Sequence, residues 1–223
     1  MNPVRTTMLA VATRCDELKL PYFVTGSVAA MAWGEPRHTL DVDIVVELSS
    51  SKVNEFCQAF APPGWYVSED AAHEAAQRSG QFNTIFPEAG VKADIIAFRD
   101  TPLNNSRLFR AREVEFDERR VMFASPEDVI LKRLRYFREG ESDKHLRDCA
   151  SILKVSGAAV DLEYIEEWAL RTSVASEWLA IEQRLGIVKA VVADTPECGV
   201  SDVAARNPRR DQLTHCFEWA GQE

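Results

Sequence analysis

The 223-residue sequence has no apolar run that approaches the about 18 residues needed to span a membrane, so we expect no membrane span. Its first twenty residues, MNPVRTTMLAVATRCDELKL, lack a long apolar stretch followed by a small-residue cleavage site. We therefore expect them to form an amphipathic helix rather than a signal peptide. Internal repeats, low-complexity blocks and Gly/Ser linkers are also missing. With 46% hydrophobic and 27% charged residues, the composition excludes a fibrous or wholly disordered chain.

The sequence has too few cysteines for a disulfide-rich protein, and its basic residues are fewer than its acidic ones. The five cysteines are odd in number and widely scattered, which fits neither a disulfide framework nor a zinc site and suits a reducing cytoplasm. The 26 lysines and arginines are outnumbered by 35 acidic residues, giving a net charge of −9. This balance argues against a protein that coats itself broadly in nucleic acid, although a local basic groove on an acidic body remains compatible with it.

Hydrophobic periodicity predicts alternating helices and strands up to about residue 124, and helices alone after it. The expected strands are 22–24, 40–48, 65–67, 82–86, 91–98, 113–116 and 120–123. The expected helices are 3–19, 28–33, 52–60, 71–78, one from 125 on, 143–154, 161–171 and 174–192. Residues from Asp194 onward carry little periodicity. The fold class is therefore α/β (α+β), a mixed sheet flanked by helices in residues 1–124 followed by a helical region, 125–223.

The helical region opens with a recognisable start signal. Residues 125–128, Ser-Pro-Glu-Asp, supply a serine cap, a proline at the first helical position and acids in the first turn. Ile130, Leu134 and Phe137 follow at i, i+4 and i+7, which predicts the buried face of this helix.

Two aspartates stand two residues apart in the clearest predicted strand, LDVDIVVEL. Side chains at i and i+2 of a strand point to the same face, so Asp41 and Asp43 should lie side by side. Leu40, Val42 and Ile44 should then point the opposite way, into the core. Two neighbouring carboxylates raise each other's pKa unless a cation lies between them. Oxygen ligands suit Mg²⁺, so the pair predicts a magnesium site.

A possible phosphate site precedes the pair, and a third acid follows it. Gly26-Ser27 lies between a short strand and a short helix, where glycine permits close approach and N–H groups and a serine hydroxyl can hold phosphate. Asp94 stands mid-strand among apolar residues, where a charge is costly unless paired or metal-bound. Three carboxylates and a phosphate cradle indicate two-metal phosphoryl chemistry.

These motifs resemble those of the nucleotidyltransferase superfamily, whose fold is like that of DNA polymerase beta. The segment TGSVAAMAWGEPRHTLDVDIVV is similar to the G-x-x-R-x-T-x-D-x-D pattern of AbiEii-type toxin nucleotidyltransferases and their uncharacterised relatives. FNTIFPEAGVKADIIAF resembles their strand pair ending in K-x-D, and SPEDVILKRLRYFREGESDKHLRDCASIL resembles their helical P-E-D…K-L…D segment. The three segments cover about residues 20–155, in the expected order. The spacer between Ser27 and Asp41 is longer than in the shortest superfamily motifs.

The resemblance implies a role for each matching residue. Asp41 and Asp43 would bind the metals, and Asp94 would hold one metal and help the attacking hydroxyl lose its proton. Gly26 and Ser27 would bind the triphosphate. The remaining matches are Arg37 and Thr39, which would hold phosphate or brace the metal loop, Lys132, which would meet the triphosphate, and Asp148, which would order the site.

For four of these residues, plainer interpretations stay open. Arg37 could pair with a structural carboxylate, and Lys132 could be an ordinary exposed helix lysine. Asp148 could pair with Lys144 at i, i+4. Asp94 could be an exposed position on a sheet face, with Asp100 as the alternative third acid.

The implied activity is Mg²⁺- or Mn²⁺-dependent transfer of NMP from an NTP to an acceptor hydroxyl, on residues 1–124 as the catalytic core. The resemblance suggests tRNA or a protein as acceptor, in a toxin–antitoxin system with a possible cognate partner. Two alternatives remain: transfer to a small molecule, and a non-catalytic member of the fold that binds a nucleotide or a partner.

Overall fold

The computed structural model describes residues 2–61, 64–116, 119–140 and 142–187. Its α-helices are α1 (Pro3–Glu17), α2 (Gly26–Trp33), α3 (Val53–Ala59), α4 (Glu69–Arg78), α5 (Pro102–Phe109), α6 (Pro126–Gly140), α7 (Asp143–Ser156), α8 (Leu162–Arg171) and α9 (Ala175–Leu185). Its strands are β1 (Tyr22–Thr25), β2 (Asp41–Val46), β3 (Tyr66–Val67), β4 (Gln81–Phe86), β5 (Val91–Ala97), β6 (Arg112–Phe116) and β7 (Arg119–Phe123). Within the described part of the chain, no helix has both the length and the apolar character needed to cross a membrane.

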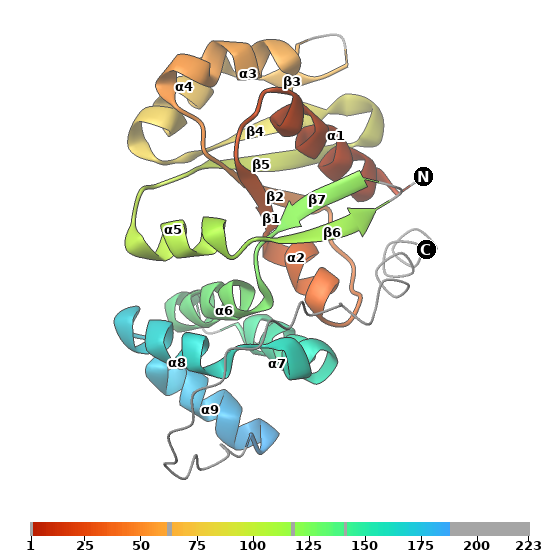
Figure 1. Cartoon of the computed structure of the whole chain (residues 1–223). Helices are drawn as coiled ribbons and strands as arrows, with labels where there is room; N and C mark the ends of the chain where they lie inside the picture. The colour runs from red at the N-terminus through yellow and green to blue at the C-terminus, as the bar shows by residue number, and fades with distance from the viewer. Residues whose placement is uncertain (1, 62–63, 117–118, 141, 188–223) are drawn as a thin grey trace, which may run out of the picture.

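The described strands form one mixed sheet in the order β3-β4-β5-β2-β1-β7-β6. The sheet confirms the predicted α/β class. β2 lies between β1, to which it is antiparallel, and β5, to which it is parallel. Figure 1 shows α6 to α9 gathered at one end of this sheet, with α2 between them and the strands. The alternation of helices and strands ends at β7, as the sequence predicts.

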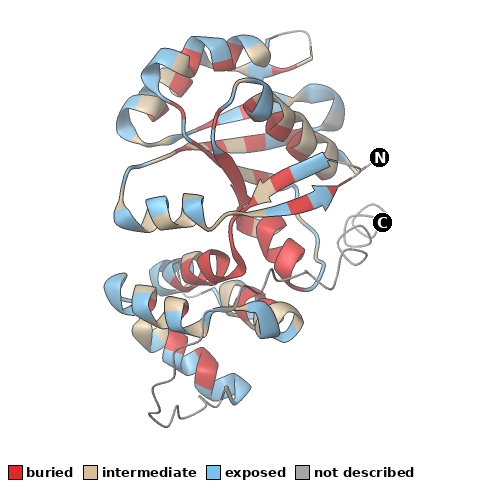
Figure 2. Ribbon diagram, in the orientation of Figure 1, coloured by how far each residue is buried: buried red, intermediate tan, exposed pale blue. Residues whose placement is uncertain are grey.

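The core follows the central strands and the helices that cover them. Buried residues concentrate on β1, β2, α2 and the first half of α6, as Figure 2 shows. β1 is buried along its whole length, and so are all residues of α2 except Ser27. A strand buried on both faces reads as a continuous apolar run rather than an alternating one. The site described below therefore stands on elements that are largely buried in the core.

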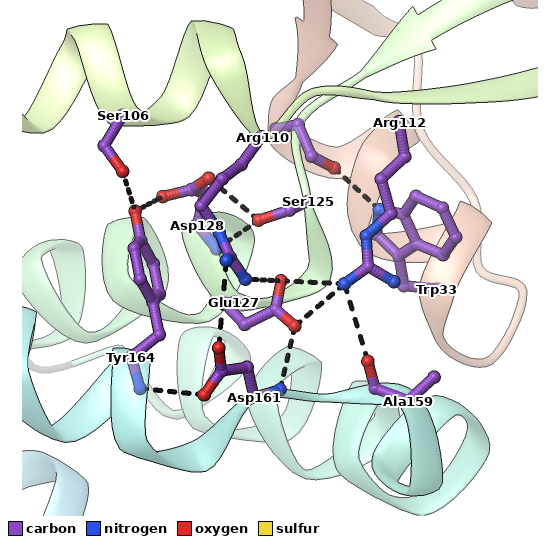
Figure 3. Close-up of polar contacts among 11 residues, drawn as sticks. Trp33, Ser106, Arg110, Arg112, Ser125, Glu127, Asp128, Ala159, Asp161 and Tyr164 are labelled. Carbon is purple, nitrogen blue, oxygen red and sulfur yellow. Dashed lines mark hydrogen bonds and ion pairs between the residues drawn. The ribbon is translucent and has the colours of Figure 1, made fainter. Parts of the chain in front are cut away.

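The helix start at residues 125–128 is confirmed, but its acids are not on the surface. Ser125 Oγ accepts a hydrogen bond from the Asp128 backbone N–H at 3.2 Å and donates one to Asp128 Oδ2 at 2.8 Å. Glu127 and Asp128 are buried, at 0% and 1% exposure. Figure 3 shows them among polar partners from α5, β6 and α8. These acids thus join the sheet to the helical region instead of only complementing a helix dipole.

The structure corrects three further expectations. Leu40 does not enter the core: it precedes β2 and is 60% exposed. The polar stretch after Asp100 contains α5, which was not predicted. The last predicted helix, 174–192, ends at Leu185, where Gly186 adopts a left-handed conformation. The segments 188–192 and from Asp194 onward lie outside the described residues, and the division into 1–124 and 125–223 stays a prediction.

Candidate active site

Asp41 and Asp43 lie at the start of β2, on the face that the alternation predicts. Val42 and Ile44, on the opposite face, are both 0% exposed, whereas Asp41 is exposed and Asp43 is half-buried. Asp43 is paired across the sheet with Thr25 of β1 and with Asp94 of β5. The register therefore brings the second and third predicted carboxylates to directly opposite positions on neighbouring strands.

The carboxylate of Asp43 lies against the first residue of α2. A Cβ placed on Gly26 would come within 1.8 Å of Asp43 Oδ2, so any larger residue there would have to displace the Asp43 side chain. Gly26 also has φ +67°, a left-handed conformation that other residues adopt at a cost. β1 runs directly into α2 at this point, so the amino-terminal end of the helix meets Asp43. Backbone N–H groups at a helix start favour anions.

Asp94 has a cationic neighbour on its own strand, the lysine of the K-x-D pattern. Lys92 Nζ lies 3.2 Å from Asp94 Oδ1, and Lys92 is also paired with Asp41 in the β2–β5 register. The Asp94 side chain is 14% exposed, so it is not simply a solvated position on the sheet. Lys92 supplies positive charge where the three acids would otherwise only repel one another. Among the described residues, no three His, Cys, Asp or Glu side chains are grouped closely enough to hold a metal ion.

Burial makes the charge on Asp43 costly. Its pKa is raised first by burial, and then by the nearby Asp94 and Asp41, while Lys132 and Arg133 act in the opposite direction. The pKa of Lys132 is lowered to about 8, mainly by burial and by Arg107, although Asp43 favours its charged form. Both residues shift towards neutrality in spite of their mutual attraction, so desolvation outweighs the pair. Lys132 is thus desolvated near Asp43 and is not an ordinary exposed helix lysine.

Ser27 is held by two arginines that share one aspartate. Arg37 Nη2 donates to Ser27 Oγ at 2.7 Å, and its Nε donates to Asp148 Oδ1 at 3.0 Å. Arg133 Nε lies 3.0 Å from Asp148 Oδ2, and Arg133 Nη2 donates to Ser27 Oγ at 3.4 Å. A serine hydroxyl has two acceptor positions and one donor proton. Because both arginines occupy acceptor positions, the hydroxyl proton is left to donate to an incoming anion.

This Ser27–Arg37–Arg133–Asp148 cluster bears on two of the open interpretations. Arg37 has the structural carboxylate partner that was considered for it, Asp148. Asp148 is buried and pairs with Arg37 and Arg133 rather than with Lys144. Sequence reasoning missed Arg133, although its position four residues after the buried Val129 was a usable signal for an inward-facing charge.

Two predicted residues lie at the edge of this arrangement. Thr39 Oγ1 accepts a hydrogen bond from the Asp41 backbone N–H at 3.4 Å, which braces the start of β2. Asp100, the alternative third acid, is exposed and accepts a hydrogen bond from Asn105 at 2.8 Å. The structure therefore gathers Gly26, Ser27, Asp43, Asp94 and Lys132 more closely than it does these two.

Gly26→Ala is expected to destabilise the protein far more than Gly90→Ala. Both glycines have positive φ, +67° and +64°, but a Cβ at position 90 would have no atom within 4 Å. Gly90→Ala should therefore cost only the backbone strain of about 1–2 kcal/mol, while Gly26→Ala adds the collision with Asp43. The free energy of unfolding, measured in urea, compares the two variants.

The double variant Gly26→Ala/Asp43→Ala is the control for this experiment. Removing the Asp43 carboxylate should return the loss to the value of Gly90→Ala. Equal losses in the two single variants would mean that Asp43 does not lie against Gly26.

Comparisons with known proteins agree with the fold. No protein-family model matches the sequence, and no curated protein matches it significantly. The structure is similar to the solution structure of the antibiotic-resistance factor ANT(2'')-Ia, with TM-score 0.53 and 18% identity over 84% of this chain and 100% of the other. It is also similar to the crystal structure of ANT(2'')-Ia in complex with adenylyl-2''-tobramycin, with TM-score 0.52 and 18% identity over 78% and 97%. The chain therefore has the predicted nucleotidyltransferase fold. The closer likeness to AbiEii-type toxins stays a prediction.

Proposed function

We propose that the protein is a Mg²⁺-dependent nucleotidyltransferase that moves NMP from an NTP to an acceptor hydroxyl. The observation that carries this proposal is the contact between Asp43 and Gly26. It brings a half-buried carboxylate, the start of a helix and an oriented serine hydroxyl to one point on the sheet. A carboxylate pair beside a phosphate cradle is the arrangement that phosphoryl transfer requires.

The chemistry of the three acids suits a hard divalent cation, but their carboxylates are not grouped closely enough in the described residues to hold one as they stand. Asp41, Asp43 and Asp94 offer only oxygen ligands, and the pKa of Asp43 is raised first by burial and then by the two neighbouring acids, a cost that a bound cation would reduce. Asp41 and Asp43 would hold two Mg²⁺ ions, with Asp94 a ligand of one, and Mn²⁺ would serve as well. When bound, the metal would neutralise charge on the phosphates.

Each residue of the candidate site would have a separate role in the transfer reaction. Ser27 would donate its free proton to a phosphate oxygen, with Arg37, Arg133 and Asp148 fixing its orientation. Lys132 would balance phosphate charge near Asp43. Asp94, released from Lys92, would accept the proton of the acceptor hydroxyl as that oxygen attacks the α-phosphorus and pyrophosphate leaves. Thr39 would keep the start of β2 in place.

The resemblance to AbiEii-type motifs favours tRNA or a protein as the acceptor. The protein would then act within a toxin–antitoxin system. A small-molecule acceptor is the second candidate. The solved structure of ANT(2'')-Ia with adenylyl-2''-tobramycin, which has the same fold, favours it. The net charge of −9 also favours a compact acceptor over a broad RNA surface.

The test is incubation with Mg²⁺, each α-³²P-labelled NTP, and total tRNA, cell lysate or a panel of small alcohols. Gels and thin-layer chromatography would then locate the label. A labelled RNA, protein or small molecule, absent when EDTA removes the metal, would establish transfer and name the acceptor class. NTP binding without any transfer would indicate the non-catalytic alternative. Neither binding nor transfer would reject the proposal.

A further inference from the structure

A small pocket next to Lys132 has an unusual concentration of positive charge. Its volume is about 110 Å³. The polar and apolar groups that line it come mainly from two helices, and they include Leu103 and Arg107 of α5 and Asp128, Lys132, Arg135 and Tyr136 of α6. Three cations therefore face one carboxylate in this space, which we call the α5–α6 pocket. Because Lys132 also interacts with Asp43, the pocket adjoins the candidate active site.

Two hydrogen-bond donors of Arg107 have no acceptor among the described residues. Its Nε and Nη2 atoms are buried and have no hydrogen-bond partner among the described residues. Only Nη1 is engaged, donating to Asn104 Oδ1 at 3.1 Å, while the guanidinium lies 5.1 Å from the Phe23 ring centroid. A buried guanidinium with unmade hydrogen bonds is costly. Such a group in a cavity wall indicates an acceptor that binds there.

Asp128, the one carboxylate among the described residues that line the pocket, does not accept a hydrogen bond from these Arg107 donors. Asp128 accepts hydrogen bonds from Ser125 at 2.8 Å and from the Tyr164 hydroxyl at 3.0 Å, as Figure 3 shows. Among the described residues it accepts no hydrogen bond from Arg107 Nε or Nη2, although the opposite charges of Asp128 and Arg107 attract each other. The cations also repel one another: Arg107 and Arg135 both help to lower the pKa of Lys132. An anion in the pocket would relieve that repulsion.

We propose that the α5–α6 pocket binds a phosphate-type oxyanion, with Arg107 donating through Nε and Nη2 and with Lys132 and Arg135 balancing its charge. The pocket is small and partly open, and it has room for a phosphate group beside the three cations. Arginine is well matched to this ligand because its planar donors meet two phosphate oxygens together. The site itself does not depend on transfer activity; only the source of the anion rests on the proposed function.

Titration calorimetry with inorganic pyrophosphate tests the pocket. Arg107→Gln and Arg135→Gln should each weaken pyrophosphate binding about tenfold relative to the unmodified protein. Arg78→Gln is the matched control, because Arg78 lies on α4 in an exposed ion pair with Glu74, and it should bind as the unmodified protein does. Arg135 is 52% exposed, so its variant stays informative if Arg107→Gln, checked by its melting temperature, fails to fold. An unchanged affinity in the folded variants, or no binding of pyrophosphate at about 10 mM, would overturn the proposal.

The same variants identify which molecule brings the anion. If the pocket holds a phosphate of the nucleotide, ATP binding should weaken by the same factor as pyrophosphate binding. If it holds an anionic group of the acceptor, ATP binding should be unchanged, and pyrophosphate should still bind to protein saturated with ATP. Either result supports the anion site. Failure of the proposed function appears separately, as absence of label transfer in an otherwise binding-competent protein.

Discussion

Asp43→Asn is expected to abolish nucleotide transfer without weakening the fold. Losing one carboxylate of the metal-binding pair should remove several kcal/mol of transition-state stabilisation, and about 4 kcal/mol corresponds to roughly a 1,000-fold slower reaction. The stability effect should have the opposite sign. The pKa of Asp43 is raised in the folded protein, so ionised Asp43 destabilises the fold at neutral pH. An uncharged asparagine of similar shape removes that cost.

The combined measurement is the rate of label transfer and the free energy of unfolding in urea. We expect a large loss of transfer with an unfolding free energy that is equal or higher, which is typical of a residue kept for function at the expense of stability. Asp100→Asn is the matched control, because Asp100 is an exposed acid just after β5 and should change neither quantity. Retained transfer in Asp43→Asn, and in Asp41→Asn beside it, would remove the aspartate pair from the mechanism.

The part of the site carried by strands could be predicted from the sequence. LDVDIVVEL and VKADIIAF combine β-branched residues with polar positions two apart, so the faces of Asp41, Asp43 and Asp94 followed from the period of a strand. Their direct opposition did not follow, because strand order and register depend on how the chain crosses the sheet. Leu40 was misplaced for a local reason: β2 begins one residue later, so the alternation does not extend to it.

Helix α5 could not be found from hydrophobic periodicity. PLNNSRLF has no buried residue, so there was no apolar face to detect. A capping signal was present, since Thr101 Oγ1 accepts a hydrogen bond from the Asn104 backbone N–H and Pro102 stands at the first helical position. Missing α5 also hid Arg107, and with it the α5–α6 pocket.

Ion pairs between residues far apart in the sequence were the hardest feature to predict. Arg37 and Asp148 are 111 residues apart in sequence, and their contact depends on how α7 packs against α2. A sequence shows that a charge stands next to apolar residues, as with Arg133 and Glu127, but not which opposite charge will meet it. The contribution of the polar network around Glu127 to the free energy of unfolding can be measured by substitution.

Glu127→Ala is expected to cause the largest loss of stability of any single charged-residue substitution proposed for this chain. Glu127 is 0% exposed, and its two oxygens lie 3.0 Å from Arg112 Nη2 and 3.3 Å from Arg110 Nη2. It also accepts a hydrogen bond from the Asp161 backbone N–H at 2.9 Å, which ties α8 to α6, as Figure 3 shows. Breaking a buried ion pair typically costs about 3–5 kcal/mol. We expect about 3 kcal/mol, because Arg110 and Arg112, at 26% and 36% exposure, retain some contact with water.

Glu113→Ala separates this effect from that of losing any glutamate–arginine pair. Glu113 and Arg120 form an exposed pair at 3.4 Å on the neighbouring strands β6 and β7, and such pairs contribute about 0–1 kcal/mol. Urea unfolding followed by tryptophan fluorescence suits the comparison, since Trp33 lies beside Arg112. Because Glu127 is on the same helix as Lys132 and Arg133, its loss should also weaken NTP binding, whereas Glu113→Ala should not. Equal losses of stability in the two variants would mean that the Glu127 network does not hold the helical region to the sheet.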